Sequence, residues 1–463
     1  MDWCGRWESP FQEYVESFAG LIGDQRTKCT FAEILKGIVG GGSLVCEQIA
    51  RHSPVLSRVK HGTQRIIRLA KGQSTQRSRL TAEPLVSRLR ERGLAQLKPS
   101  SAEGVWLILD QSNLCKPYAQ EMPELMYVLD LDKRLVPGYR TMNVLGVTPG
   151  RRGLLYHHLY SSEAEDFVSE SMETRLALQT TLRALREAGI SGPITWIMDR
   201  DFDDVAAWRT IWEDLAHLLC RVKHTERLVR FRQRCGSWQE GDIAQACAHL
   251  QPLTQCPSEM KMRLGRQKRA KRQTVQVSIS ACPLELVYDQ NVRRPGAEQW
   301  MTKALWLVRV EALKAHEEPW LLITDWPVED AEMALQIFRM YRERWAIEDS
   351  FHYTKTCLGW EEVQLLHFEA IRTLVAMSWV AAGFLYELGV TLDWPEVQLL
   401  ARLGGWTPHK NRRPGRIVIT RGLAALLHTY TTEAILQDYI HEHGGLPPGI
   451  AALIRDFGGP DLC

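Results

Sequence analysis

The residues best suited to chemistry lie in one stretch near position 350. Four polar residues there are separated by three, four and seven positions: Tyr341, Arg344, Glu348 and Lys355. On one helix this spacing places them on one face. Such a face suits a phosphate group, because the carboxylate can hold a metal ion while the two cations contact phosphate oxygens. The alternative is a solvent-exposed face with a Glu348–Arg344 ion pair, and the spacing fits both.

Two aspartates follow strand-like segments further upstream. Residues 105–109 are a short, wholly apolar run that ends at Asp110, and the mainly apolar residues 194–198 repeat this pattern and end at Asp199, as expected for strands that are buried on both faces. Two such strands could bring both carboxylates to the same edge of one sheet. Other acids stand close by in the sequence and are the alternatives: Asp130, Asp132 and Asp201.

This combination resembles the DDE transposases of the insertion-sequence-four type. The third acid of that family lies in a Tyr-x2-Arg-x3-Glu-x6-Lys signature, which the four residues near position 350 match without a gap. Asp110 and Asp199 occupy the places of the first two acids, which in the family end two strands of an RNase H-like core. The resemblance covers roughly residues 100 to 365 and is most specific over the last forty of these.

The resemblance implies a metal-dependent enzyme that cuts and joins DNA. In-line attack on a phosphodiester is served by two divalent ions about 3.5–4 Å apart. Carboxylate oxygens are hard ligands that favour Mg²⁺, for which Mn²⁺ can substitute. Asp110 would bridge the two ions, and Asp199 and Glu348 would each complete the ligand set of one.

The resemblance also implies DNA contacts around the metal site. Arg344 and Lys355 would neutralise phosphate charge near the cut, and Tyr341 would donate a hydrogen bond to a phosphate. Trp320 would stack on a base flipped from the element end, and its alternative is a core tryptophan at the start of a strand. Trp345 could line the same pocket or belong to the core.

The reaction implied is cut-and-paste transposition at the inverted-repeat ends of a mobile element, through a hairpin intermediate and then strand transfer. The partners would be the double-stranded DNA of the element ends and of the target, and a second copy of the chain. The helices after residue 367 are the expected dimer contact. Two alternatives fit the same residues: a DNA-binding relative that no longer cuts, and an RNase H-like nuclease without strand transfer.

The composition is that of a soluble enzyme with several domains. The chain has 463 residues, of which 45% are hydrophobic and 24% charged, with a net charge of +2. The sequence contains neither a secretory leader pattern nor an apolar run of about 18 residues, which predicts a cytoplasmic protein without a membrane partner, and the resemblance implies the nucleoid of a bacterium. Eleven scattered cysteines predict reduced thiols. A zinc site is the alternative for four of them: Cys235, Cys247, Cys256 and Cys282.

Two segments are strongly basic. Residues 51–98 carry twelve Lys or Arg against two acids, and residues 221–272 carry thirteen against four. This density suits a polyanion, and a solvated basic face is the alternative. The first segment has the succession of a helix-turn-helix, in which three residues would face a DNA groove: Gln64, Arg65 and Arg68. Six residues of the second would follow backbone phosphates: Arg263, Arg266, Lys268, Arg269, Lys271 and Arg272.

These patterns predict an α/β fold, which by resemblance is an RNase H-like catalytic core with a β-rich insertion, flanked by helical N- and C-terminal regions. The expected units are a helical DNA-binding domain at 1–100, the first part of the core at 101–220, the insertion at 221–318, the second part of the core at 319–366 and a helical region at 367–463. Further strands are expected at 139–147, 154–160 and 320–324. Helices are expected at 165–188 and, as one long helix, at 328–356.

Overall fold

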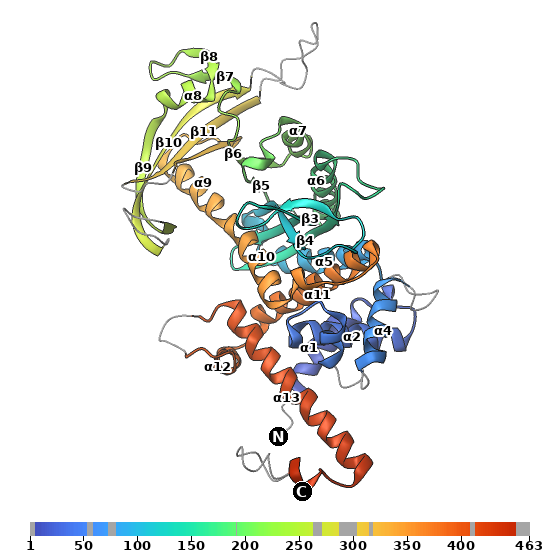
Figure 1. The fold of residues 1–463 in the computed structure, drawn as a ribbon. Helices are drawn as coiled ribbons and strands as arrows, with labels where there is room; N and C mark the ends of the chain where they lie inside the picture. Colours follow the sequence, from blue (N-terminus) through green and yellow to red (C-terminus); the bar gives the residue numbers. More distant parts are fainter. Residues whose placement is uncertain are drawn as a thin grey trace.

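The computed structural model describes residues 5–52, 59–72, 80–190, 192–262, 271–286, 303–313, 318–407 and 413–450. Over these residues the protein is a mixed α/β structure, in which helices flank a mixed sheet of twelve strands (Figure 1). Strand side chains alternate between two apolar layers. Ile108 packs in one layer, whereas Leu107 and Leu109 pack in the other, because successive side chains point to opposite faces of a sheet. Both faces of the central strands are therefore covered.

Before the sheet, the described residues form the helices α1 (Gly5–Glu16), α2 (Gln25–Gly41), α3 (Cys46–Arg51), α4 (Val59–Ala70) and α5 (Ala82–Leu97). The Asp24 side chain caps α2 by accepting from the N–H of Thr27, and Gly42 ends the helix in the left-handed region. The Ser43 hydroxyl accepts from the N–H of Val45, the residue that precedes α3.

The central part of the sheet positions the candidate site. Its strands are β1 (Val105–Cys115), β3 (Leu135–Thr148), β4 (Arg151–Tyr160), β5 (Ile194–Met198) and β6 (His217–Arg221). In space their order is β4-β3-β1-β5-β6. The strand β3 is antiparallel to both β4 and β1, while β5 is parallel to β1 and β6 is parallel to β5. The carboxyl ends of β1, β5 and β6 therefore lie at one edge.

The predicted strands 194–198 and 320–324 are confirmed at both ends as β5 and β12 (Trp320–Thr324). The run predicted at 105–109 continues to Cys115, because the residues after Leu109 remain paired with β3. The short strand β2 (Met126–Leu129) pairs with the outer part of β3.

The region between β6 and β12 extends the same sheet. Its strands are β7 (Leu228–Arg232), β8 (Trp238–Asp242), β9 (Gln251–Met262), β10 (Lys271–Leu286) and β11 (Lys303–Ala312), with the short helix α8 (Ile243–Ala246). The strand β12 pairs with β6 on one side and with β11 on the other. The region is therefore rich in strands, and these strands continue the core sheet.

The remaining helices are α6 (Glu170–Glu187), α7 (Val205–Glu213), α9 (Ala331–Glu343), α10 (Trp345–Cys357), α11 (Phe368–Thr391), α12 (Trp394–Leu403) and α13 (Arg416–His443). Short 3-10 turns occur at Ala19–Leu21, Lys98–Glu103, Arg200–Phe202, Cys247–His249 and Trp360–Glu362. Helix α6 begins five residues later than expected, because the Ser169 side chain caps it by accepting from the N–H of Met172.

The prediction of one long helix at 328–356 is wrong. The segment consists of α9 and α10, which meet at Arg344. There the N–H of Arg344 bonds to the carbonyl of Tyr341, and the N–H of Ile347 bonds to the carbonyl of Arg344. These bonds reach back three residues instead of four, so the helix tightens at this point.

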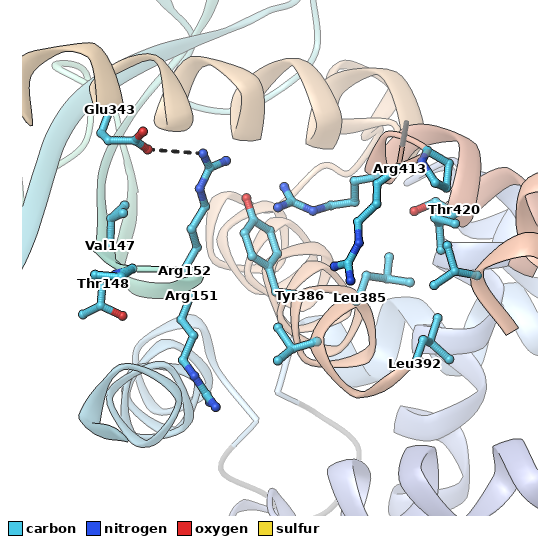
Figure 2. A pocket seen from close by; sticks show the side chains of 18 of the residues that line it. Val147, Thr148, Arg151, Arg152, Glu343, Leu385, Tyr386, Leu392, Arg413 and Thr420 are labelled. Atoms are coloured by element: carbon cyan, nitrogen blue, oxygen red, sulfur yellow. Dashed lines mark hydrogen bonds and ion pairs between the residues drawn. The ribbon is translucent and has the colours of Figure 1, made fainter. Parts of the chain in front are cut away.

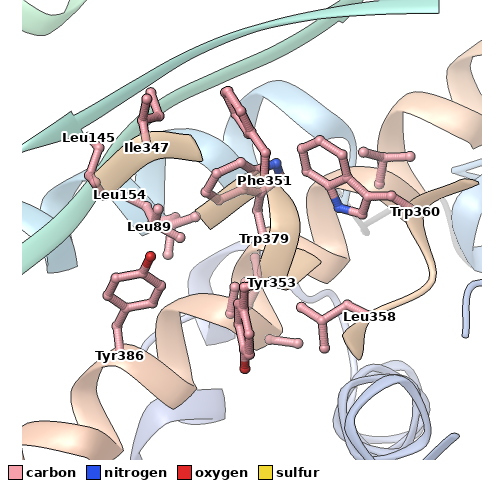
Figure 3. Packing of buried hydrophobic residues seen from close by; sticks show 14 of the residues in the cluster. Leu89, Leu145, Leu154, Ile347, Phe351, Tyr353, Leu358, Trp360, Trp379 and Tyr386 are labelled. Atoms are coloured by element: carbon pink, nitrogen blue, oxygen red, sulfur yellow. The ribbon is translucent and has the colours of Figure 1, made fainter. Parts of the chain in front are cut away.

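Helix α11 forms the centre of the C-terminal part. It is long and apolar enough to cross a membrane, yet 83% of its most apolar window is buried inside the protein. Figure 3 shows Trp379 of this helix packed with Phe351 of α10 and with Trp360. The indole N–H of Trp360 donates to the hydroxyl of Ser378, 2.6 Å away. This packing fixes α10, and therefore Glu348, against the sheet.

Candidate active site

The three predicted acids converge on one guanidinium group. Nη1 of Arg344 lies 3.4 Å from Oδ2 of Asp110 and 3.7 Å from Oδ2 of Asp199. Nη2 of the same side chain lies 2.5 Å from Oε1 of Glu348. The acids come from β1, from the residue after β5 and from α10. Residues separated by more than two hundred positions thus meet around a single cation.

The two aspartates are held by the same local device. Oδ1 of Asp110 accepts from the N–H of Gln111 at 2.8 Å, and Oδ1 of Asp199 accepts from the N–H of Arg200 at 2.7 Å. In each case the other oxygen faces Arg344. Leu109 and Met198, the residues before them, are register partners in the parallel strands β1 and β5. Strand pairing therefore sets the separation of the two carboxyl groups.

The site is partly enclosed and rich in negative charge. The side chains of Arg344, Asp110 and Asp199 are 9%, 18% and 27% exposed, and that of Glu348 is 49% exposed. Burial raises the pKa of Asp110 to about 7, and the neighbouring Asp199 and Glu348 also raise it, whereas Arg344 lowers it. Burial opposes the charge on Arg344, but Tyr341 and the three acids raise its pKa above the usual range.

The alternative acids lie outside this group. Asp201 is 73% exposed and pairs with Lys223 at 3.2 Å. Asp130 and Asp132 both pair with Arg134. Among the candidates considered from the sequence, the acids that contact Arg344 are therefore Asp110, Asp199 and Glu348.

Tyr341 lies beside Arg344, and Lys355 lies further along β1, at Asn113. Tyr341 is 4% exposed, and its hydroxyl has no hydrogen-bond partner among the described residues. Burial, and then the charge of Asp199, raises the pKa of this phenol. The ammonium group of Lys355 donates to the carbonyl of Asn113 at 2.6 Å and pairs with Glu361 at 3.3 Å. An unpartnered hydroxyl and a cation could both contact a bound phosphate.

Trp320 belongs to an aromatic group beside the site. Its ring centroid lies 5.2 Å from that of Tyr341, 5.5 Å from that of Trp345 and 6.2 Å from that of Phe338. Trp320 and Trp345 are both half-buried. Trp320 thus packs within an aromatic group and keeps part of its surface accessible.

The predicted DNA-binding residues are described only in part. Gln64 and Arg68 are exposed on α4, and Arg65 there is half-buried. Lys271 and Arg272 begin β10, although their side chains lie outside the description. Four further predicted contacts lie outside the described residues altogether: Arg263, Arg266, Lys268 and Arg269.

The acids offer the ligand chemistry that Mg²⁺ prefers, namely hard carboxylate oxygens. Within the described ranges, no three His, Cys, Asp or Glu side chains are close enough as they stand to share one ion. At the candidate site the Arg344 guanidinium lies among the acids and partly neutralises them. The four cysteines considered for zinc are free thiols that range from exposed Cys235 to buried Cys282. The residues present therefore fit a magnesium site better than a zinc site.

We expected the Arg344 side chain to contact a phosphate, whereas it lies among the three acids. The four-residue step from Arg344 to Glu348 predicted their ion pair, but the contacts of Arg344 with Asp110 and Asp199 depend on tertiary structure.

No known protein-family model matches the chain, and no curated protein matches it.

The raised pKa of Asp110 predicts a defined effect of pH on stability. The folded protein holds this proton more tightly than the unfolded chain, whose aspartates titrate near 3.8. The contribution of this proton to the stability of the folded protein is therefore complete below pH 3.8 and is lost as the pH rises through about 7. We expect Asp110→Asn to increase the free energy of unfolding in EDTA at pH 8, by about 2–4 kcal/mol. Urea unfolding between pH 4 and pH 8 measures this. If the increase in the free energy of unfolding caused by Asp110→Asn is as large at pH 4 as at pH 8, the raised pKa of Asp110 is contradicted.

Arg344 should contribute to stability as the shared counter-ion. We expect Arg344→Met to lower the free energy of unfolding in EDTA by about 1–3 kcal/mol, because three carboxylates lose their cation. Mg²⁺ should then raise the melting temperature of the variant more than that of the parent protein. The matched control is Arg339→Met on the exposed face of α9, which should change the melting temperature little. Equal responses to Mg²⁺ in both variants would contradict this role.

Proposed function

We propose that the protein is a DNA transposase of the DDE type, resembling the insertion-sequence-four family, with an RNase H-like catalytic core. The strand order β4-β3-β1-β5-β6 supports the core assignment. Three of these strands form an antiparallel unit, and the next two continue the sheet in parallel with β1. The first two acids then stand on β1 and directly after β5, and the third stands on a helix against the same sheet.

The observation that carries the proposal is the convergence of Asp110, Asp199 and Glu348 within 4 Å of one guanidinium group. Three carboxylates around one point are costly to enclose unless cations offset their charge. Above the pKa of Asp110, which is about 7, Arg344 supplies one positive charge against three negative ones. The remaining charge favours divalent cations, and a structural ion pair would need only one of the acids.

Asp110, Asp199 and Glu348 would hold two Mg²⁺ ions, with Mn²⁺ as a substitute. These ions, when bound, activate a water or a 3′-hydroxyl and stabilise the leaving oxygen of the cleaved phosphodiester. The protein fixes the two aspartates through their bonds to the N–H groups of Gln111 and Arg200. Such fixed ligands lower the cost of ordering the site when a substrate binds.

The residues around the acids would bind DNA. Lys355 and Arg344 would neutralise phosphate charge, and the unpartnered hydroxyl of Tyr341 would donate to a phosphate oxygen. Trp320 would stack on an extruded base at the element end. Tyr341, Trp320 and Trp345 form one aromatic group next to Arg344, so stacking and cleavage would take place side by side.

The substrates would be the inverted-repeat ends of a mobile element and a target DNA. Two ends have to be cut and joined together, so the active form would be a homodimer on DNA. The enzyme would act in the bacterial cytoplasm, on the nucleoid. By resemblance, the route includes a hairpin at each element end.

Cleavage of a supercoiled plasmid that carries the element ends tests this function. We expect nicked and linear products with Mg²⁺ or Mn²⁺ and none with EDTA. Asp110→Asn, Asp199→Asn and Glu348→Gln should each lower the cleavage rate by at least about 100-fold, because the loss of a ligand removes transition-state charge stabilisation. The matched control is Asp201→Asn, whose carboxylate pairs with Lys223 outside the group and whose loss should leave the rate within about twofold.

The same assay separates the alternatives. Metal-independent binding of the ends without any cleavage would indicate a DNA-binding relative that does not cut. Cleavage without joining of pre-cut 3′-hydroxyl ends to a target plasmid would indicate a nuclease. Full activity in all three acid variants would contradict the assignment of the site itself.

A further inference from the structure

A cavity outside the candidate active site has none of the three acids in its lining. It has a volume of about 620 Å³. Its walls come from the turn between β3 and β4, the end of α9, the last turns of α11, and the starts of α12 and α13. Figure 2 shows Arg151, Arg152 and Glu343 on one side, and Tyr386, Arg413 and Thr420 on the other. Chain segments far apart in the sequence thus enclose one space.

The lining of the cavity is basic on both sides. Four arginines line it: Arg151, Arg152, Arg413 and Arg416. Glu343 is the one acid among the described lining residues, and it pairs with Arg152 at 3.4 Å. Arg413 is exposed, and within the described part of the chain neither Arg413 nor Arg416 pairs with a carboxylate. This excess of unneutralised cations around a concave surface favours an anionic ligand.

The arginines are presented in different ways. The Arg416 guanidinium lies 3.6 Å from the ring centroid of Tyr386, so it is held flat against an aromatic face. Arg151 donates to the carbonyl of Gln96 at 3.3 Å, which leaves its other N–H groups available. Two arginines are thus fixed in place, and the exposed Arg413 can move to meet a ligand.

The start of α13 adds to the positive potential. This helix of 28 residues begins after Gly415, has no side-chain cap and has no acid in its first turn. The first N–H groups of a helix have no partner within the helix, and the helix dipole is positive at this end. The cavity is lined by Pro414, Arg416, Ile419 and Thr420 from this end, so a phosphate there would meet both guanidinium and helix N–H donors.

Another part of the cavity is apolar. Aliphatic side chains of α11, α12 and the link between them line it: Leu385, Val390, Leu392 and Val397. The half-buried indole of Trp106 adds an aromatic surface. A site for inorganic phosphate alone would have no use for this wall. A ligand that joins a phosphate to a flat, weakly polar ring would use both parts.

We propose that this cavity binds a nucleotide unit, with its phosphate at Arg413, Arg416 and the start of α13, and with its base against the apolar wall. The volume lies within the range of small-molecule sites, about 300–1,000 Å³. Two sources share this chemistry: one nucleotide of a DNA strand, and a free nucleotide.

Binding of one nucleotide of a DNA strand rests on the proposed function and is supported by the positions of the residues. Trp106 and Asp110 both stand on β1, four residues apart and therefore on the same face of the sheet, about 13 Å from each other. Glu343, which pairs with the cavity residue Arg152, precedes Arg344 in the chain. A DNA strand that passes the three acids could thus place a neighbouring nucleotide in the cavity.

Titration calorimetry in EDTA tests the proposal without any contribution from cleavage. The full chain is titrated with deoxyadenosine 5′-monophosphate, with an oligonucleotide of eight thymidines and with inorganic phosphate. The test variant is Arg413→Glu/Arg416→Glu, which reverses both charges at the start of α13. The control is Arg175→Glu/Arg183→Glu, which carries the same charge change on exposed positions of α6.

We expect the test variant to bind the oligonucleotide at least about 10-fold more weakly than the parent protein, and the control to stay within about twofold, since charge-assisted bonds are lost only in the cavity. If the affinity for the mononucleotide falls as much as that for the oligonucleotide, the ligand is a free nucleotide. If only the affinity for the oligonucleotide falls, the ligand is a nucleotide of a DNA strand. Equal losses in both variants, or inorganic phosphate binding as tightly as the mononucleotide, would overturn the proposal. Circular dichroism melting confirms that both variants fold, and plasmid cleavage, measured separately, reports on the three acids.

Discussion

The interaction on which the rest of the structure depends is the contact of one arginine with three carboxylates. Arg344 reaches Asp110, Asp199 and Glu348 with two nitrogen atoms of one side chain. It stands where α9 ends and α10 begins, so the same residue marks the tightening of the helix and the centre of the site. Removal of the positive charge would leave three acids facing one another in a partly enclosed space.

The sheet makes this convergence possible. Parallel pairing of β1 with β5 brings Asp110 and Asp199 to one edge, and their bonds to the following N–H groups turn one oxygen of each toward Arg344. Helix α10 is held on the same side by the packing of Phe351 and Trp360 against α11 (Figure 3). The enclosed setting raises the pKa of Asp110 and at the same time strengthens any interaction with a bound cation. Enclosed carboxylates repel one another when no cation is bound, and this repulsion favours the binding of cations.

The sequence predicted the elements with strong local patterns. Residues 194–198 and 320–324 are mainly apolar runs that each follow a proline and precede an aspartate, and both form strands with those limits. The helix break at Arg344 was not predicted, because the local sequence continues an amphipathic helix and the cause lies in contacts with other elements. The sequence singled out the three acids that contact Arg344, since two follow apolar runs and the third stands in a signature spacing, although Asp110 lies within β1 and not after it. The basic cavity was missed because its arginines are far apart, at 151–152 and at 413–416, and only the fold brings them together.

The most direct test of this account is the anomalous diffraction of Mn²⁺ soaked into crystals of the protein. The account predicts anomalous density within about 2.5 Å of an Asp110 oxygen and next to Asp199 or Glu348. Asp110→Asn crystals soaked in the same way should lose this density. Mn²⁺ density found elsewhere on the protein, with Arg344 still in contact with all three acids, would contradict the claim that these carboxylates form a metal site.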